Sequence, residues 1–164
     1  IRKISHYLLI KCANCSINFA IMKHKNSISQ INPLRDREML LLYRKALDVV
    51  EYPTTIDKIC EVVSSLSTSC YYISDTSAFR YVSQRLKGII PSFDKASYRK
   101  QQLYEALYDE FLRIREQHKE KSLCIYKLVD LTIEQPAPCL GLSPRTIRDK
   151  LSAHFNLNNT NIIQ

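Results

Sequence analysis

Residues 56–86, IDKICEVVSSLSTSCYYISDTSAFRYVSQRL, and residues 125–155, IYKLVDLTIEQPAPCLGLSPRTIRDKLSAHF, decide the fold. The second stretch follows the pattern of the first at a constant offset of 69 residues, from Ile56 to Ile125, without a gap. In both stretches apolar side chains recur every three or four positions, which is the period of an amphipathic helix. Each stretch therefore predicts two helices, and the two together predict an internal repeat.

The agreement lies in core positions and helix caps rather than in identity, because five residues are identical over positions 56–86. The matched pairs are Ile59 with Leu128, Cys60 with Val129, Val63 with Thr132, Cys70 with Cys139, Ser74 with Ser143, Ala78 with Ile147, Val82 with Leu151 and Leu86 with Phe155. Any two amphipathic helix pairs can be slid into rough agreement, and that is the alternative to a repeat. An amphipathic helix precedes each pair, which favours a three-helix unit.

Local signals place the remaining helices and the breaks between them. A first helix is expected after Pro33, and Thr54 or Thr55 is expected to cap the second. A long fourth helix is expected from about Ser97 to His118, with Tyr104, Leu107, Tyr108, Phe111 and Ile114 facing inward. Gly88 is expected to end the third helix, and Pro136 and Pro138 follow the fifth. Ser74 and Ser143 are expected to cap the third and sixth helices.

The expected fold class is all-α, with about six helices arranged as two tandem three-helix, helix-turn-helix-like units. The expected parts are a basic, poorly ordered leader at 1–32, a first unit at 33–90, a second at 91–155 and a polar tail at 156–164. Composition agrees, since 164 residues with 45% hydrophobic and 24% charged are typical of a globular protein. Two glycines disfavour the turn-rich β folds and the glycine loops of nucleotide-binding folds.

The positive charge is concentrated near the start of the chain. The net charge is +8, and residues 1–32 contain five lysines or arginines and no acidic residue. We expect this leader to be a poorly ordered extension, and a basic arm that grips DNA is the functional alternative. No apolar stretch in it reaches the length of a membrane-spanning helix or of a secretory signal core. A cytoplasmic protein without a membrane partner is the expectation.

Three short helices with a serine-capped, basic third helix are the plan of helix-turn-helix and homeodomain-like modules. Arginine and lysine suit contacts to guanine edges and phosphates, so double-stranded DNA is the expected partner. The predicted DNA-binding residues are Arg80, Arg85 and Lys87 in the first unit and Arg145, Arg148 and Lys150 in the second. Against this, Arg80 falls opposite Asp149, and the connections at 67–73 and 136–142 are longer than a strict helix-turn-helix allows.

The alternative is a non-catalytic interaction module that binds a protein partner or forms a homo-oligomer. In that interpretation the long fourth helix and its tyrosines, Tyr98, Tyr104 and Tyr108, mediate association. A solvated charged face is also the commonest explanation of basic residues on a helix.

Pro136-Ala137-Pro138, followed by Ser143-Pro144-Arg145-Thr146, resembles a poorly characterised bacterial family found in gut bacteria and their mobile elements. Its members look like tandem helical units with a Pro-Ala-Pro-x-Phe-Tyr segment before the last helix. The resemblance would cover about residues 33–155 and implies a regulatory or accessory role, but no established activity. Here Leu140-Gly141 replaces the Phe-Tyr, while Tyr71-Tyr72 stands at the matching place in the first unit.

No residue pattern indicates catalysis, a metal site or a cofactor, so the chain is not expected to be an enzyme. The four histidines are scattered, and Glu116, His118 and Glu120 are spaced two apart on a helix, where side chains point in different directions. Cys12 and Cys15 form a single C-x-x-C, which without a second pair is a weak zinc signal. The six cysteines are expected to be reduced thiols that fill apolar space.

Overall fold

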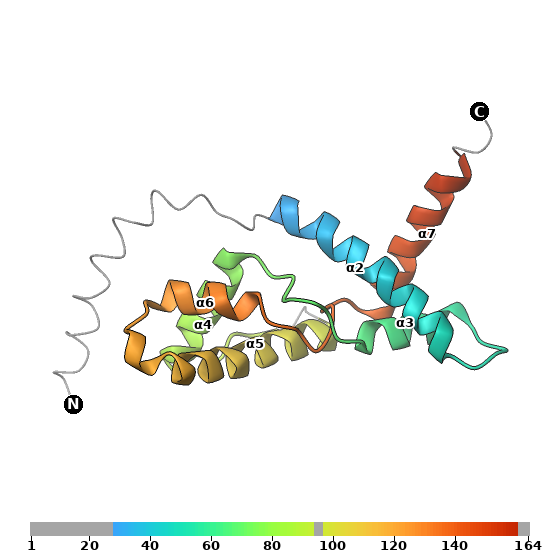
Figure 1. Cartoon of the computed structure of the whole chain (residues 1–164). Coiled ribbons are helices and arrows are strands. Elements are labelled where there is room, and N and C mark those ends of the chain that lie inside the picture. Colours follow the sequence, from blue (N-terminus) through green and yellow to red (C-terminus); the bar gives the residue numbers. More distant parts are fainter. Residues whose placement is uncertain (1–27, 94–96, 161–164) are drawn as a thin grey trace.

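The computed structural model describes residues 28–93 and 97–160, and these residues form helices and connecting segments without a β-strand (Figure 1). The elements are α2 (Ile28–Val49), α3 (Ile56–Ser65), α4 (Asp75–Leu86), α5 (Tyr98–Gln117), the 3₁₀ turn η1 (Lys119–Lys121), α6 (Ile125–Ile133) and α7 (Pro144–Thr160). The prediction of an all-α fold with about six helices is confirmed.

Two expected boundaries are wrong. Helix α2 begins at Ile28 and includes Pro33, so residues 28–32 belong to a helix and not to the leader. A proline at this position removes one helical hydrogen bond, but Ile31 in the same turn is 7% exposed, and its burial offsets part of that cost. Helix α7 continues to Thr160, through most of the expected polar tail. The rest of the leader, 1–27, and residues 161–164 lie outside the described residues.

Serine and threonine hydroxyls cap four of the described helices, α3, α4, α5 and α7. The side chains of Thr55, Ser74 and Ser97 each accept a hydrogen bond from the backbone N–H three residues later. The Ser143 hydroxyl does the same for Thr146 N–H, and α7 starts at the following Pro144. Ser74 and Ser143 also share a second feature, because each hydroxyl lies 2.8 Å from the hydroxyl of the residue three positions on.

The helices pack in a grouping that differs from their order in the chain. One cluster of buried side chains joins α2 and α3 to α7, and the other joins α4 to α5 and α6. Figure 1 shows α2, α3 and α7 at one end of the molecule and α4, α5 and α6 at the other. Helix α4, expected in the unit at 33–90, therefore packs with α5 and α6, and α7, expected in the unit at 91–155, packs with α2 and α3. The sequence could not show this, because α4 and α7 have the same pattern and each could complete either unit.

The chain crosses between the two ends at two connectors, 66–74 and 134–143. Thr68 and Ala137 pair there in an isolated antiparallel bridge. The Thr68 N–H donates to Ala137 O at 2.8 Å, and the Ala137 N–H donates to Thr68 O at 3.2 Å. Tyr71 N–H also donates to Ile133 O, at 3.0 Å. These bonds satisfy backbone groups that burial would otherwise leave unpaired.

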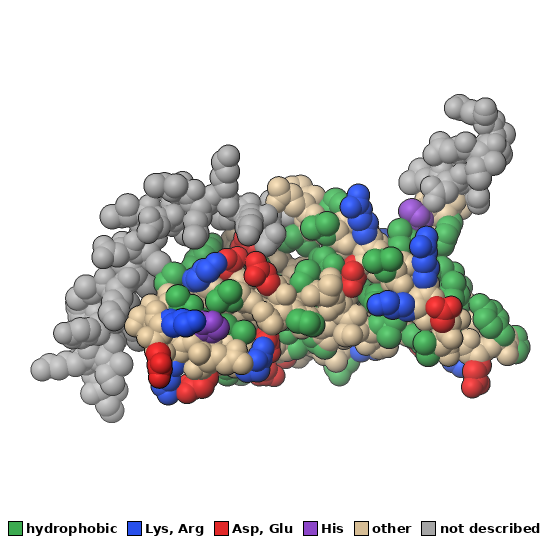
Figure 2. All heavy atoms as spheres, viewed as in Figure 1, with side chains coloured by type: hydrophobic (Ala, Val, Ile, Leu, Met, Phe, Trp, Pro, Cys, Tyr) green, Lys and Arg blue, Asp and Glu red, His purple; other side chains and the backbone are tan. Residues whose placement is uncertain are grey.

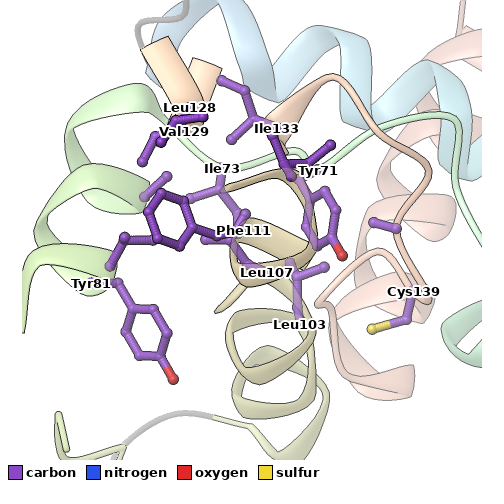
Figure 3. Packing of buried hydrophobic residues seen from close by; sticks show 14 residues of the cluster. Tyr71, Ile73, Tyr81, Leu103, Leu107, Phe111, Leu128, Val129, Ile133 and Cys139 are labelled. Atoms are coloured by element: carbon purple, nitrogen blue, oxygen red, sulfur yellow. The ribbon is translucent and has the colours of Figure 1, made fainter. Parts of the chain in front are cut away.

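The core of the α4–α5–α6 end is built on one face of α5. Leu103, Leu107 and Phe111 follow one another along that face (Figure 3). Tyr71 and Cys139, one from each connector, belong to the same buried cluster. The crossing segments are therefore part of the core rather than surface loops.

Candidate nucleic-acid interface

On α4 the three predicted DNA-binding residues have different surroundings. Arg80 and Lys87 are exposed and form no ion pair with any described carboxylate. Arg85 instead donates to Glu105 of α5 at 2.8 Å, and its guanidinium lies 4.7 Å from the centre of the Tyr108 ring. A cation held by both a carboxylate and a ring is less available to a phosphate. Arg80 and Lys87 are thus the outward cations of α4.

On α7 the three predicted residues divide in the same way. Arg145 is exposed and unpaired with any carboxylate in the described ranges. Arg148 forms an ion pair with Asp57 of α3 at 2.9 Å, and Lys150 forms one with Asp36 of α2, also at 2.9 Å. Both pairs tie α7 to the helices it packs against. They are partly exposed, so each stabilises that docking by less than about 1 kcal/mol.

The six predicted residues do not form one continuous patch. Arg80, Arg85 and Lys87 belong to the α4–α5–α6 end, and the other three belong to the α2–α3–α7 end. On the face shown in Figure 2, lysine and arginine side chains lie among aspartate and glutamate side chains at both ends of the molecule. The arrangement thus offers two separate basic helices rather than a single basic surface.

A groove beside α4 brings Arg80 together with two cations that the sequence did not single out, Arg35 and Lys100. It consists of two adjoining hollows, with cavity volumes of about 360 and 300 Å³, which share Ser77, Lys100 and Tyr104. The first hollow also includes Arg80, and the second includes Arg35 of α2. No aspartate or glutamate among the described residues lines either hollow. We call this feature the Arg35–Arg80–Lys100 groove.

The groove was missed because its cations come from three helices far apart in the chain. Arg35 is on α2, Arg80 on α4 and Lys100 in the first turn of α5. Each is a single basic residue on a helix, which in sequence is indistinguishable from an ordinary solvated position. The packing of α4 and α5 next to the start of α2 brings them to one groove.

Polar groups in the groove are linked to one another. The Ser74 hydroxyl donates to the Ser77 hydroxyl at 2.8 Å. Burial raises the pKa of Tyr104, while a hydrogen bond with Ser77 and the charge of Arg80 act in the opposite direction. Arg35 donates to Asn32 Oδ1 at 2.9 Å, but its buried Nε has no hydrogen-bond partner among the described residues. The groove therefore has a donor, Arg35 Nε, that no described residue accepts from.

The tyrosines of the alternative interaction module are mostly taken up by the core. Tyr104 packs edge-on against Tyr81 with ring centres 5.0 Å apart, and Tyr108 stacks on Phe111. Tyr98 remains 74% exposed. A surface made of all three tyrosines is therefore not present on α5.

Glu116 and His118, near the end of α5, have partners within their own segment. Glu116 pairs with Lys119, and His118 Nδ1 lies 3.0 Å from Ile114 O in its own helix. Within 28–93 and 97–160, no group of three or more His, Cys, Asp or Glu side chains is arranged to hold a metal ion. None of the described helices combines the length and apolarity needed to cross a bilayer. Cys12 and Cys15 lie outside the described residues.

Comparisons with protein-family models, curated proteins and solved structures find no significant match to this chain. The resemblance carried by Pro136-Ala137-Pro138 stays a prediction. Any functional conclusion depends on the residues and contacts described above.

Proposed function

We propose that this chain is a DNA-associated protein that contacts double-stranded DNA through the outward faces of α4 and α7. The observation that carries the proposal is that these two helices share one design. Each is begun by a serine that caps the backbone and contacts a second hydroxyl, and each packs as the third helix on a pair of helices, α4 on α5 and α6 and α7 on α2 and α3. Each also keeps outward cations, Arg80 and Lys87 on α4 and Arg145 on α7.

We also propose that the chain is an internal repeat whose two units have exchanged their third helices. Positions 69 residues apart agree in burial, as in Ile59 with Leu128 and Val82 with Leu151. The bridge between Thr68 and Ala137 joins two positions that the proposed repeat makes equivalent. Pairing of equivalent residues is what a two-fold relation between units requires. Helices α4 and α7 belong to different cores, and each has an outward face. Two such faces suit two separate contacts on one duplex.

The three predicted residues that form ion pairs are expected to contribute less to DNA binding than the exposed cations without a pair. Arg85, Arg148 and Lys150 would have to leave Glu105, Asp57 and Asp36 to contact DNA. The described residues carry 18 lysines and arginines and 15 aspartates and glutamates, so their net charge is 18 − 15, or +3. Binding is therefore expected to depend on where the unpaired cations lie rather than on overall charge.

The test is a salt titration of binding to a random-sequence duplex, followed by fluorescence anisotropy. We expect the logarithm of the affinity to fall linearly with the logarithm of salt concentration, because phosphate contacts release counterions. Replacing Arg80, Lys87 and Arg145 together by alanine should reduce the slope by up to about 2.7, at about 0.9 per phosphate contact.

The matched control replaces Arg113, Lys119 and Lys127 by alanine. This replacement also removes three positive charges. Each of the three exposed cations is paired with a carboxylate three residues away. The control should leave the slope nearly unchanged. No binding at low salt, or an equal loss of slope in the control, would contradict the proposal and would favour the interaction module.

A further inference from the structure

We propose that the Arg35–Arg80–Lys100 groove is a phosphate-binding site, and that the phosphates are those of a DNA strand passing beside α4. The identity of the strand rests on the proposed function, whereas the phosphate chemistry rests on the groove itself. The sequence did not indicate this site, and none of the three α7 residues predicted to bind DNA contributes to it.

The charged side chains among the described residues that line the groove are all positive. Arg35, Arg80 and Lys100 line the two adjoining hollows, and no described carboxylate does. This differs from much of the surface, where six described lysines and arginines have a carboxylate within ion-pair distance. A concave surface with one sign of charge concentrates the field and raises the local concentration of counter-ions. The groove therefore attracts anions more strongly than its surroundings.

The donors that line the groove match the oxygens of a phosphate. Arginine offers a planar fork of N–H groups, lysine offers a compact charge, and hydroxyls donate to oxygen. Ser74, Ser77 and Tyr104 supply hydroxyls to the same groove. Ser74 and Ser77 also lie at the start of α4, where the helix dipole favours negative charge. A phosphate, with several oxygens around one centre, can accept from more of these groups at once than a carboxylate can.

The groove adjoins the outward face of α4. Arg80 lines the first hollow and is also one of the two outward cations of α4. A duplex read by α4 has its sugar–phosphate backbone on either side of that helix, because a helix in the major groove is flanked by both strands. The strand on the α5 side would pass over Arg80 and Lys100. The groove thus supplies backbone contacts that position α4 and carry no base specificity.

The first arm of the test measures duplex binding by Lys100→Ala. Lys100 is exposed, so its removal leaves the core intact. We expect the salt slope to fall by about 0.9 and the affinity to fall equally for duplexes of different sequence. The control is Lys119→Ala, which removes an exposed lysine outside the groove and should leave the slope unchanged. If the wild-type chain binds duplex and Lys100→Ala binds it with the same slope and affinity, the DNA assignment of the groove is overturned while the proposed function stands.

The second arm uses inorganic pyrophosphate and needs no DNA binding. Thermal unfolding is followed at increasing pyrophosphate, with sodium chloride added to keep the ionic strength constant. A bound anion raises the melting temperature because it binds the folded state. We expect a rise for the wild type and for Lys119→Ala, and a reduced rise for Lys100→Ala and Arg80→Ala.

The two arms separate the sources of phosphate. A loss in both arms supports the full proposal. A loss in the pyrophosphate arm without any duplex binding supports a phosphate site for a free phosphorylated ligand and refutes the proposed function. If neither readout depends on Lys100 or Arg80, the groove is not a phosphate site and the inference is wrong.

Discussion

Gly141 lies so close to Leu103 that a Cβ atom built on the glycine would be 2.5 Å from Leu103 Cδ2. Gly141 also has a φ of +68°, a conformation that side chains with a Cβ rarely adopt. The contact joins the connector before α7 to the core face of α5. It explains why glycine stands at this position, which aligns with Tyr72 of the first connector.

Gly141→Ala is expected to destabilise the protein by about 2–4 kcal/mol, adding the cost of positive φ to that of overpacking. Gly88→Ala is the matched control. Gly88 has a φ of +76°, but nothing lies within 4 Å of the place that a Cβ atom would occupy, so its loss should be limited to about 1–2 kcal/mol. Urea unfolding of both variants measures the difference. Equal losses would show that Leu103 moves aside without cost.

The packing partners of α4 and α7 predict which end of the molecule loses hydrogen-exchange protection after a core substitution. Leu151→Ala in α7 should lower hydrogen-exchange protection in α2 and α3, because Leu151 is buried with Met39 and Leu42. Val82→Ala in α4 should lower it in α5 and α6, because Val82 is buried with Leu107 and Val129. Mass spectrometry of peptides from α3 and α6 distinguishes the two. The opposite pattern would mean that consecutive helices pack together.

Two buried tyrosines predict a loss of stability in alkali. Burial, together with the negative charge of nearby carboxylates, raises the pKa of Tyr71 and Tyr81 from 10.0 to about 12. For Tyr81 the hydrogen bond that its hydroxyl donates to Glu105, at 3.0 Å, adds to the effect. The folded state then holds these protons more tightly than the unfolded chain, so stability is complete below pH 10 and falls from pH 10 to 12.

The measurement is urea unfolding of the wild type and of Tyr81→Phe at about pH 8 and pH 11. The wild type should lose more stability than Tyr81→Phe over this interval, by roughly 1 kcal/mol. The reason is that pH 11 lies about one unit above the ordinary tyrosine pKa. Tyr52→Phe, at an exposed position, should behave like the wild type. An identical pH dependence in Tyr81→Phe and the wild type would contradict the assignment.

The thiols are expected to differ in reactivity. Burial raises the pKa of Cys60 and of Cys139, whose Sγ also lies 3.6 Å from Arg99 O. Cys124 is exposed at the N-cap of α6. Because the thiolate is the reactive form, iodoacetamide should modify Cys124 well before the other two in the folded protein. Peptide mapping by mass spectrometry gives the order, and urea should remove the difference. Early modification of Cys139 would show that its end of the core opens readily.

Local features of the fold were predictable because local chemistry determines them. The caps at Ser74, Ser97 and Ser143 and the helix stop at Gly88 follow from hydroxyl acceptors and positive φ, both of which the sequence displays. The prediction of the inner face of α5 was correct for Leu107, Phe111 and Ile114 but did not include Leu103. Tyr104 and Tyr108 were placed inward and are half-buried, since a tyrosine keeps its polar end near water.

The relations between distant segments were not predictable from periodicity. An amphipathic stripe shows that α7 must bury Ile147 and Leu151, but it does not show which helices cover them. The ion pairs that occupy Arg85, Arg148 and Lys150 have partners 20, 91 and 114 residues away, so no local pattern reveals them. The gathering of Arg35 and Lys100 in one groove depends on the same long-range packing.

The packing of α7 on α2 and α3 also sets the order in which the two cores become complete as the chain is synthesised from its N-terminus. All buried members of the α4–α5–α6 core lie between Tyr71 and Cys139, whereas the other core needs residues from Met39 to Leu151. The core that starts later in the chain is therefore finished first. Until α7 emerges, the apolar faces of α2 and α3 lack their covering helix and stay exposed to water.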